Sequence, residues 1–298
     1  MAKSDLSGGF FEPHEEAAAI VRDKAVVSRE VFDGLLPELR GRAFCVTGVE
    51  GAHTVQSIRD TIATFTRGQT EDGKPVTWSD AKKQVMAHLD EAHFSPQAAE
   101  RRATLLLRTH AFQAYQAANW RAAQSDPDCT HLQYLATEDS RVRDSHLALN
   151  GVILPKNDPF WEKHYPPWEW GCRCRVRPIN QDMLEMQQAL DKHRKPEDRL
   201  VIDGPALDHL RDGQIVRGEL QDRDGRTVGM GTHDVTPPSD GPEGKDAFQW
   251  HPDNLRLPMA DLKQRYDVAV WAAFEAWAKL FKVATTRSVW AWLTGAKG

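Results

Sequence analysis

The longest uninterrupted helical pattern in the chain lies between Ser95-Pro96 and Asp126-Pro127. Proline is accepted in the first turn of a helix but not in its interior, so these two dipeptides bound a single helix. At 1.5 Å per residue this helix would extend roughly 40 Å. The sequence therefore predicts a strut rather than one member of a compact bundle.

Residues 1–125 are predicted to be mostly helical. Ser28 stands where the N-cap of one helix belongs, with Pro37 interrupting that helix, and Ser79 stands at the start of a later one. Gly68 follows a third helix in the position of a C-cap. That third helix carries apolar residues at helical spacing: Val55, Ile58, Ile62 and Phe65.

The pattern changes near Cys129, and from there to Pro178 the chain is aromatic and rich in turns. Asn150-Gly151, between two short apolar runs, has the form of a tight type I′ hairpin turn. In the stretch CRCRVR, residues alternate with period two, which predicts a strand. Cys172 and Cys174 would lie on one face of it, and three arginines on the other: Arg173, Arg175 and Arg177.

The predicted fold class is α+β. It comprises a mostly helical N-terminal region with one long helix, a small hairpin-rich α+β core module, and a helical C-terminal tail. The predicted regions are a helical part at 1–125, the core module at 126–200, a loop-rich extension at 201–258, and aromatic amphipathic helices at 259–298. Tail residues at helical spacing favour core packing, with a docking helix as the alternative: Trp271, Phe274, Trp277, Leu280 and Phe281.

Composition excludes several classes of protein. The net charge is −5, whereas a generic nucleic-acid coat is strongly basic. Four scattered cysteines do not make a disulfide framework. No apolar run long enough to span a membrane and no secretory signal at the start are visible. We therefore expect a cytosolic chain with reduced thiols. The phosphate loop, the G-x-S-x-G elbow and the H-E-x-x-H motif are missing, which argues against a nucleotide-driven motor or a standard hydrolase.

One group of residues could hold a metal. Zinc prefers four ligands in a tetrahedron, and Cys172, Cys174 and His146 with one more donor, for which Asp139 is a candidate, could supply them. The C-x-C spacing is less diagnostic than paired C-x-x-C motifs, so the alternative is that both cysteines pack as small apolar groups. Both interpretations stay open at the level of the sequence.

Two further interpretations concern charged residues. Asp139, His146 and the cysteines could form the centre of a metal-dependent hydrolase or nuclease, although carboxylates and arginines mixed this closely more often form ion-pair networks. The arginines at 173, 175 and 177 could contact DNA phosphates, but arginines on an outward strand face are more often solvated or paired.

Two blocks of sequence carry a resemblance to a known family. The first is Asp139-Ser-Arg141-Val-Arg143-Asp-Ser-His146, and the second runs from Pro166-Pro167 to Cys172-Arg173-Cys174. With these blocks the chain resembles the phage Mu F-like family of head morphogenesis proteins, minor capsid proteins of tailed phages and prophages. The resemblance covers most of residues 10–270. It implies that residues 126–200 are the Mu F-like core module, and that the residues of the two blocks form the structural motif of this module.

The resemblance implies a virion component that acts near the portal during head assembly and has no enzymatic activity. The implied partners are portal and capsid proteins of the phage head, with packaged DNA as a further contact, and neither a membrane nor a small-molecule substrate. The implied location is the virion, and the host cytoplasm during assembly. No cofactor other than zinc is expected. Residues 1–125 would then form an assembly surface.

Overall fold

Helix α5 (Pro96–Ser125) is the single long helix that the sequence predicts between the two proline dipeptides. The structure, a computed structural model, describes residues 14–169, 171–237, 250–283 and 287–295. It divides into two units: unit 1 consists of Met1–Ala118 together with Trp250–Gly298, and unit 2 of Asn119–Gln249. Helix α5 runs from one unit into the other. The sequence-based division into four consecutive regions stays a prediction.

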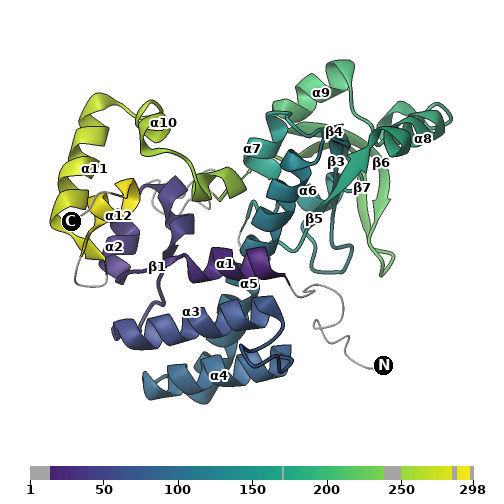
Figure 1. The fold of residues 1–298 in the computed structure, drawn as a ribbon. Coiled ribbons are helices and arrows are strands. Elements are labelled where there is room, and N and C mark those ends of the chain that lie inside the picture. The colour runs from purple at the N-terminus through teal and green to yellow at the C-terminus, as the bar shows by residue number, and fades with distance from the viewer. Residues whose placement is uncertain (1–13, 170, 238–249, 284–286, 296–298) are drawn as a thin grey trace. The chain divides into compact units, whose positions relative to one another are not determined.

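Three helices of unit 1 pack one on the next (Figure 1): α1 (Glu15–Arg22), α3 (Ala52–Arg67) and α4 (Trp78–Glu91). The apolar stripe predicted on α3 is buried, and Gly68 ends this helix in the left-handed region at φ 81°. The predicted N-cap of α4 is wrong. Thr77 caps the helix instead, because its hydroxyl accepts from the Asp80 N–H while the Asp80 carboxylate accepts from the Thr77 N–H.

The remaining part of unit 1 combines segments from both ends of the chain. Ser28 caps its helix as predicted, and that helix ends at Gly34 ahead of Pro37. The N-terminal elements are β1 (Ala25–Val26), α2 (Arg29–Gly34), η1 (Pro37–Arg42) and β2 (Ala43–Phe44), with β1 and β2 parallel. The C-terminal elements are η3 (Pro252–Leu255), α10 (Met259–Lys263), α11 (Val268–Leu280), β8 (Lys282–Val283), β9 (Arg287–Ser288) and α12 (Val289–Thr294).

One apolar core joins these two ends. It contains Val31, Leu35 and Leu39 from the N-terminal side and Trp271 and Phe274 from α11. The aromatic residues at 271 and 274 are therefore core residues, as the helical spacing predicted. Leu280 departs from that prediction: it is 78% exposed, whereas Ala278 in the same turn is buried in the core.

A buried lysine gives unit 1 a pH dependence. The Lys24 ammonium is 3% exposed and donates to Gln113 Oε1 at 3.3 Å, with His110 Nδ1 at 3.2 Å. Burial lowers the pKa of Lys24 to about 7. Between this value and the ordinary 10.5, the unfolded chain holds a proton that the folded chain lacks. The free energy of unfolding should therefore rise with pH over this window, by up to about 1.4 kcal/mol per unit.

In Lys24→Met this rise should be absent, because the group that binds protons differently in the two states has been removed. Urea unfolding at pH 7, 8 and 9 measures it. Lys83→Met, which removes an exposed lysine of α4, is the matched control and should keep the wild-type slope. Equal slopes in wild type and Lys24→Met would contradict the prediction.

Unit 2 is built on a three-stranded antiparallel sheet in the order β4-β3-β5. Its strands are β3 (Cys129–Leu135), β4 (Ile153–Pro155) and β5 (Arg175–Asn180). The helices are α6 (Asp144–Ala148), α7 (Phe160–His164) and α8 (Gln181–Asp191), the last capped by the Asn180 side chain. With helical unit 1 and these small sheets, the predicted α+β fold class is confirmed.

The predicted hairpin around Asn150-Gly151 is wrong. Leu147–Leu149 are all buried, which a half-buried hairpin strand does not allow, and residues 144–148 form helix α6 instead. A type I′ turn needs positive φ at both central residues. Here Gly151 has φ 81°, and among described non-glycine residues only His93 is positive. The partner of β4 is β3.

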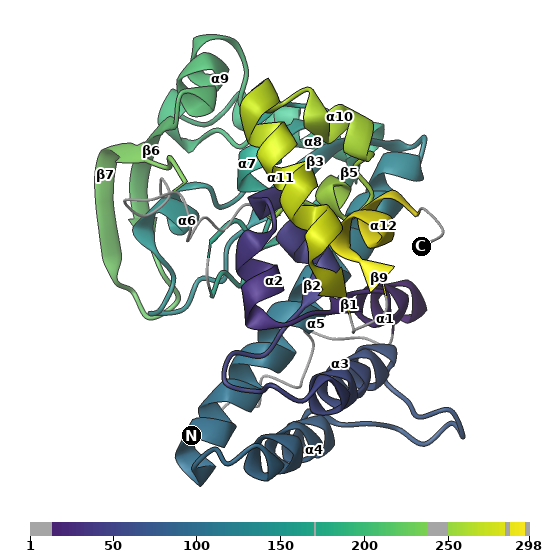
Figure 2. The same cartoon turned by 90° about the vertical axis from the view of Figure 1, so that its left-hand side faces the viewer.

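The predicted loop-rich extension contains regular structure. Its elements are α9 (Gly204–Arg211), β6 (Gln214–Gln221) and β7 (Thr227–Asp234), preceded by η2 (Pro196–Asp198). Strands β6 and β7 pair as an antiparallel hairpin (Figure 2). The Asp222 carboxylate organises its turn by accepting from the N–H groups of Asp224 and Arg226. Residues 238–249 of this region lie outside the described residues.

Among the helices that the structure describes, none combines the length and the apolar composition that crossing a membrane requires.

Candidate metal centre

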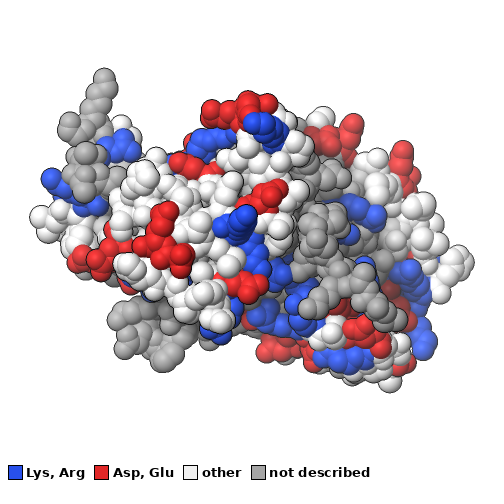
Figure 3. Space-filling model, turned by 90° about the horizontal axis from the view of Figure 1, so that it is seen from below, with Lys and Arg blue, Asp and Glu red and all other residues white. Residues whose placement is uncertain are grey.

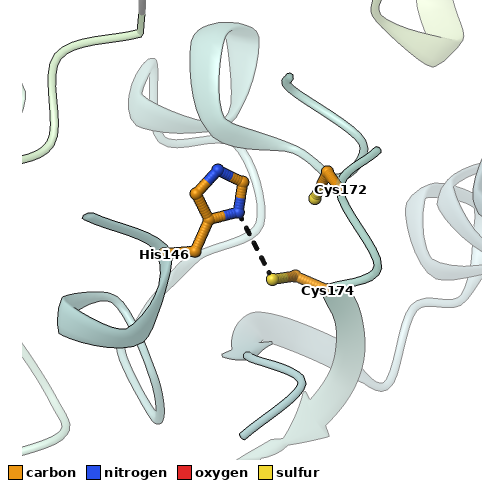
Figure 4. Close-up of side chains that lie close together, drawn as sticks. All are labelled: His146, Cys172 and Cys174. Atoms are coloured by element: carbon orange, nitrogen blue, oxygen red, sulfur yellow. Dashed lines mark hydrogen bonds between the residues drawn. The ribbon is translucent and has the colours of Figure 1, made fainter. Parts of the chain in front are cut away.

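Three predicted site residues meet in unit 2. His146 comes from α6, while Cys172 and Cys174 come from the segment immediately before β5 (Figure 4). One ligand atom of each lies within 4.8 Å of the others. The side chains are nearly sealed from solvent, with 2%, 7% and 2% exposure respectively. The structure therefore brings together an imidazole and two thiols inside the fold.

The local chain path explains why both cysteines point inward. Gly171 takes φ 73°, which turns the chain just before Cys172, and the Cys172 N–H donates to the Glu169 carbonyl at 3.0 Å. The Thr137 hydroxyl donates to the Arg173 carbonyl at 2.7 Å. Strand β5 begins only at Arg175, so the cysteines lie in an extended lead-in rather than in the predicted strand. The predicted alternation is nevertheless present: both cysteines are buried, while the arginine between them is not.

The orientation of the imidazole is fixed from its far side. His146 Nε2 lies 2.8 Å from Glu169 Oε2, and Glu169 Oε1 forms an ion pair with Arg143 at 3.0 Å. Because a carboxylate only accepts hydrogen bonds, Glu169 selects the tautomer of the neutral imidazole in which Nε2 carries the proton and Nδ1 offers its lone pair. Nδ1 faces Cys174 Sγ at 3.5 Å and the Tyr134 hydroxyl at 3.4 Å.

The indole of Trp168 covers one face of His146. The Trp168 ring stacks on His146 with a centroid distance of 4.0 Å and an angle of 13°. Its Nε1–H donates to the Tyr134 hydroxyl oxygen at 2.9 Å. Tyr134 is fully buried on the inward face of β3. Aromatic rings thus replace water around the donor atoms.

The thiols influence each other's protonation. Burial raises the pKa of Cys172, whereas the hydrogen bond from Cys172 lowers the pKa of Cys174 against the effect of burial. Burial also raises the pKa of Tyr134. The group therefore offers two sulfur atoms, one imidazole nitrogen and one phenol oxygen as donor atoms.

Asp139, the fourth predicted ligand, lies outside this group. Its carboxylate accepts both arms of the Arg173 guanidinium, at 2.5 and 2.6 Å, and these hydrogen bonds lower the pKa of Asp139 to about 2. Arg141 approaches the same carboxylate at 3.4 Å. Two charged residues of the first sequence block thus lie in ion pairs: Asp139 holds the outward side of the C-x-C segment through Arg173, and Arg143 holds Glu169.

The remaining predicted residues are two prolines and three arginines of unit 2. Pro166 and Pro167 are buried and joined by a cis peptide bond ahead of Trp168. Arg173 is held by Asp139, and Arg177 donates to Gln133 Oε1. Two of the three arginines proposed for DNA contacts are therefore engaged inside the protein. On the face shown in Figure 3, basic and acidic side chains are interspersed. These observations do not favour a continuous phosphate-binding edge.

The sequence did not identify Glu169, Tyr134 or Trp168 as neighbours of the group. Alternation would not have singled out Tyr134, because Leu132, Gln133 and Tyr134 are all buried on β3. Glu169 and Trp168 take their roles from a loop whose path no periodicity describes. The burial and the donor atoms of the group fit metal binding or tight packing.

Comparison with known proteins shows which family the sequence around this site resembles. The family model described as Phage Mu protein F like protein matches residues 63–177, which include both predicted sequence blocks. The Mu-like prophage FluMu F protein of Haemophilus influenzae is 44% identical over 82 residues, covering 27% of this chain and 20% of that protein. The putative capsid assembly protein F of Escherichia phage Mu is 27% identical over 188 residues, covering 59% of this chain and 42% of that protein.

The chain thus spans less than half the length of both curated relatives. No solved structure matches it. The match of residues 63–177 includes His146, Cys172 and Cys174, so the candidate centre lies inside the matched region. The resemblance drawn from the two sequence blocks is confirmed: this chain carries a phage Mu F-like region.

Proposed function

We propose that this chain is a structural protein that acts in the assembly of a phage or prophage head. Two observations support the proposal. Residues 63–177 match the Mu F-like family, and the alignment to a relative named as a putative capsid assembly protein extends over 59% of the chain. The family resemblance further supports a position near the portal, with portal and capsid proteins as partners, in the host cytoplasm during assembly and in the virion afterwards.

We propose that this role is not enzymatic. A hydrolase built on Asp139 and His146 would need both groups to reach a substrate. Asp139 is held by Arg173, and the His146 side chain is 2% exposed. These positions support a contribution of the whole Asp139–Cys174 region to rigidity rather than to chemistry.

Deletion of the gene tests the assembly role. In the phage or prophage that encodes the chain, an in-frame deletion should abolish DNA-filled heads in negative-stain electron microscopy, and a plasmid copy should restore them. A deletion strain that produces filled heads in wild-type numbers would contradict the proposal.

Cross-linking tests the position near the portal. Mass spectrometry of cross-linked procapsids should find peptides of this chain joined to portal peptides. Cross-links to the major capsid protein alone would remove the portal from the proposal while leaving the assembly role in place.

A further inference from the structure

The distances among the donor atoms fit a tetrahedral metal. Zinc–sulfur and zinc–nitrogen bonds of about 2.3 and 2.0–2.1 Å, opened to the tetrahedral angle, place the two ligand atoms about 3.6 Å apart. Cys174 Sγ and His146 Nδ1 are separated by 3.5 Å. All three ligand atoms lie within 4.8 Å of one another, so Cys172 needs to move by only about 1 Å, which side-chain rotation supplies.

A fourth donor stands at the same spacing. A zinc-bound oxygen and a zinc-bound nitrogen would be about 3.3 Å apart, and the Tyr134 hydroxyl oxygen is 3.4 Å from His146 Nδ1. One lone pair of that oxygen accepts from Trp168 Nε1–H, which leaves the second for a metal. The oxygen comes from β3, so the four donors derive from three separate segments of unit 2.

The surroundings are those of a ligand set. A metal-binding histidine usually donates its other N–H to a carboxylate, which fixes the tautomer and turns the bare nitrogen toward the metal. Glu169 does this for His146 at 2.8 Å and is itself held by Arg143. The Nδ1 of His146 faces Cys174 Sγ at 3.5 Å and the Tyr134 hydroxyl at 3.4 Å, so a metal bound there would take the place of these two hydrogen bonds.

We propose that unit 2 binds one Zn²⁺ through His146 Nδ1, Cys172 Sγ and Cys174 Sγ, with the Tyr134 hydroxyl oxygen as the fourth ligand. Two thiolates balance the charge of the ion, so the buried site is neutral with tyrosine as a phenol. Sulfur and nitrogen donors in a tetrahedron select zinc over magnesium or calcium, which take oxygen ligands. The ion would join α6, β3 and the segment before β5 into one rigid body.

Metal content is the first test. Chain purified without an affinity tag or chelator should contain about one zinc ion per chain by elemental analysis, as a four-ligand site implies. Cys172→Ser and Cys174→Ser should lose it. Cys129→Ser is the matched control, because Cys129 is a buried cysteine of the same unit outside the group, and it should keep its zinc. Zinc-free wild-type chain whose melting temperature does not rise with added zinc would overturn the proposal.

Cobalt spectroscopy separates metal loss from misfolding and tests the fourth ligand. The wild-type chain loaded with Co²⁺ should show thiolate-to-cobalt charge transfer and the strong visible bands of a tetrahedral site. Tyr134→Phe should keep the charge-transfer band and shift the visible bands, because one oxygen ligand is exchanged. Unchanged visible bands would overturn the assignment of Tyr134, and octahedral spectra of the wild type would overturn the site itself.

Discussion

Trp271→Ala is expected to lower the free energy of unfolding of unit 1 by about 3–5 kcal/mol, the range for removing a buried aromatic ring. The Trp271 side chain is 4% exposed. It packs against Phe274, with ring centroids 5.7 Å apart, and edge-on against Trp290 at 6.2 Å. The core around it is assembled from the two ends of the chain, so the cavity would weaken the attachment of one end to the other.

Urea denaturation followed by circular dichroism measures this loss. Leu280→Ala is the matched control: the residue lies on the same helix, but its side chain is 78% exposed, and the change should stay within about 0.5 kcal/mol of wild type. A similar cost for both variants would show that α11 contributes through helix formation alone and not through its buried face.

This core shows where prediction from sequence stops. The spacing of Trp271 and Phe274 indicates that the tail is an amphipathic helix with a buried face, but it does not name the partner of that face. The partner is the segment from Val27 to Ala43, far away along the chain. Gly34 belongs to the same contact, because a Cβ at this position would lie 2.1 Å from the Trp277 ring. Nothing in the local sequence relates a glycine near the start to a tryptophan near the end.

Local signals worked where one side chain decides a boundary. Gly68 and Ser28 were identified because the left-handed conformation of the glycine and the serine hydroxyl each satisfy the backbone at a helix end. The prediction of Ser79 as the N-cap of α4 was wrong because Thr77 and Ser79 both carry a hydroxyl that could cap this helix. Only Thr77 has Asp80 three positions later to complete the reciprocal hydrogen bonds of a capping box. The hairpin predicted at Asn150-Gly151 was wrong because the preceding residues are buried as a helix, and this outweighed the preference of Asn-Gly for a tight turn.

The sequence predicted three residues of the candidate centre correctly and misplaced the fourth, Asp139. His146, Cys172 and Cys174 were recognised by residue type, and the structure brings their ligand atoms together. Asp139 was expected beside them, yet Arg173 offers it two charged hydrogen bonds at the surface of the unit. Removing an ionised carboxylate from such a partner and burying it would cost free energy, so the ion pair takes precedence.

Arg217→Met is expected to lower the free energy of unfolding of unit 2 by about 3–5 kcal/mol, comparable with breaking a buried charged interaction. The arginine lies on β6, is 4% exposed, and donates to three carbonyl oxygens that no strand pairing satisfies. These carbonyls belong to Ala148 at 2.8 Å, Arg199 at 3.0 Å and Asn150 at 3.1 Å. Burial lowers the pKa of Arg217 to about 10, so the guanidinium remains charged at neutral pH.

Methionine fills much of the space but donates nothing, so the three carbonyls would lose a partner in the interior. Arg217→Lys should recover part of the loss, since one ammonium keeps the charge but cannot span three acceptors in the plane that a guanidinium provides. Arg223→Met is the control, because the Arg223 side chain is 75% exposed and meets Glu138 only at 3.5 Å, which predicts a change within about 1 kcal/mol. Urea unfolding of the four proteins should therefore rank wild type and Arg223→Met together, then Arg217→Lys, then Arg217→Met. A lysine variant as stable as wild type would mean that the charge alone, rather than its three directed hydrogen bonds, ties β6 to the chain around α6.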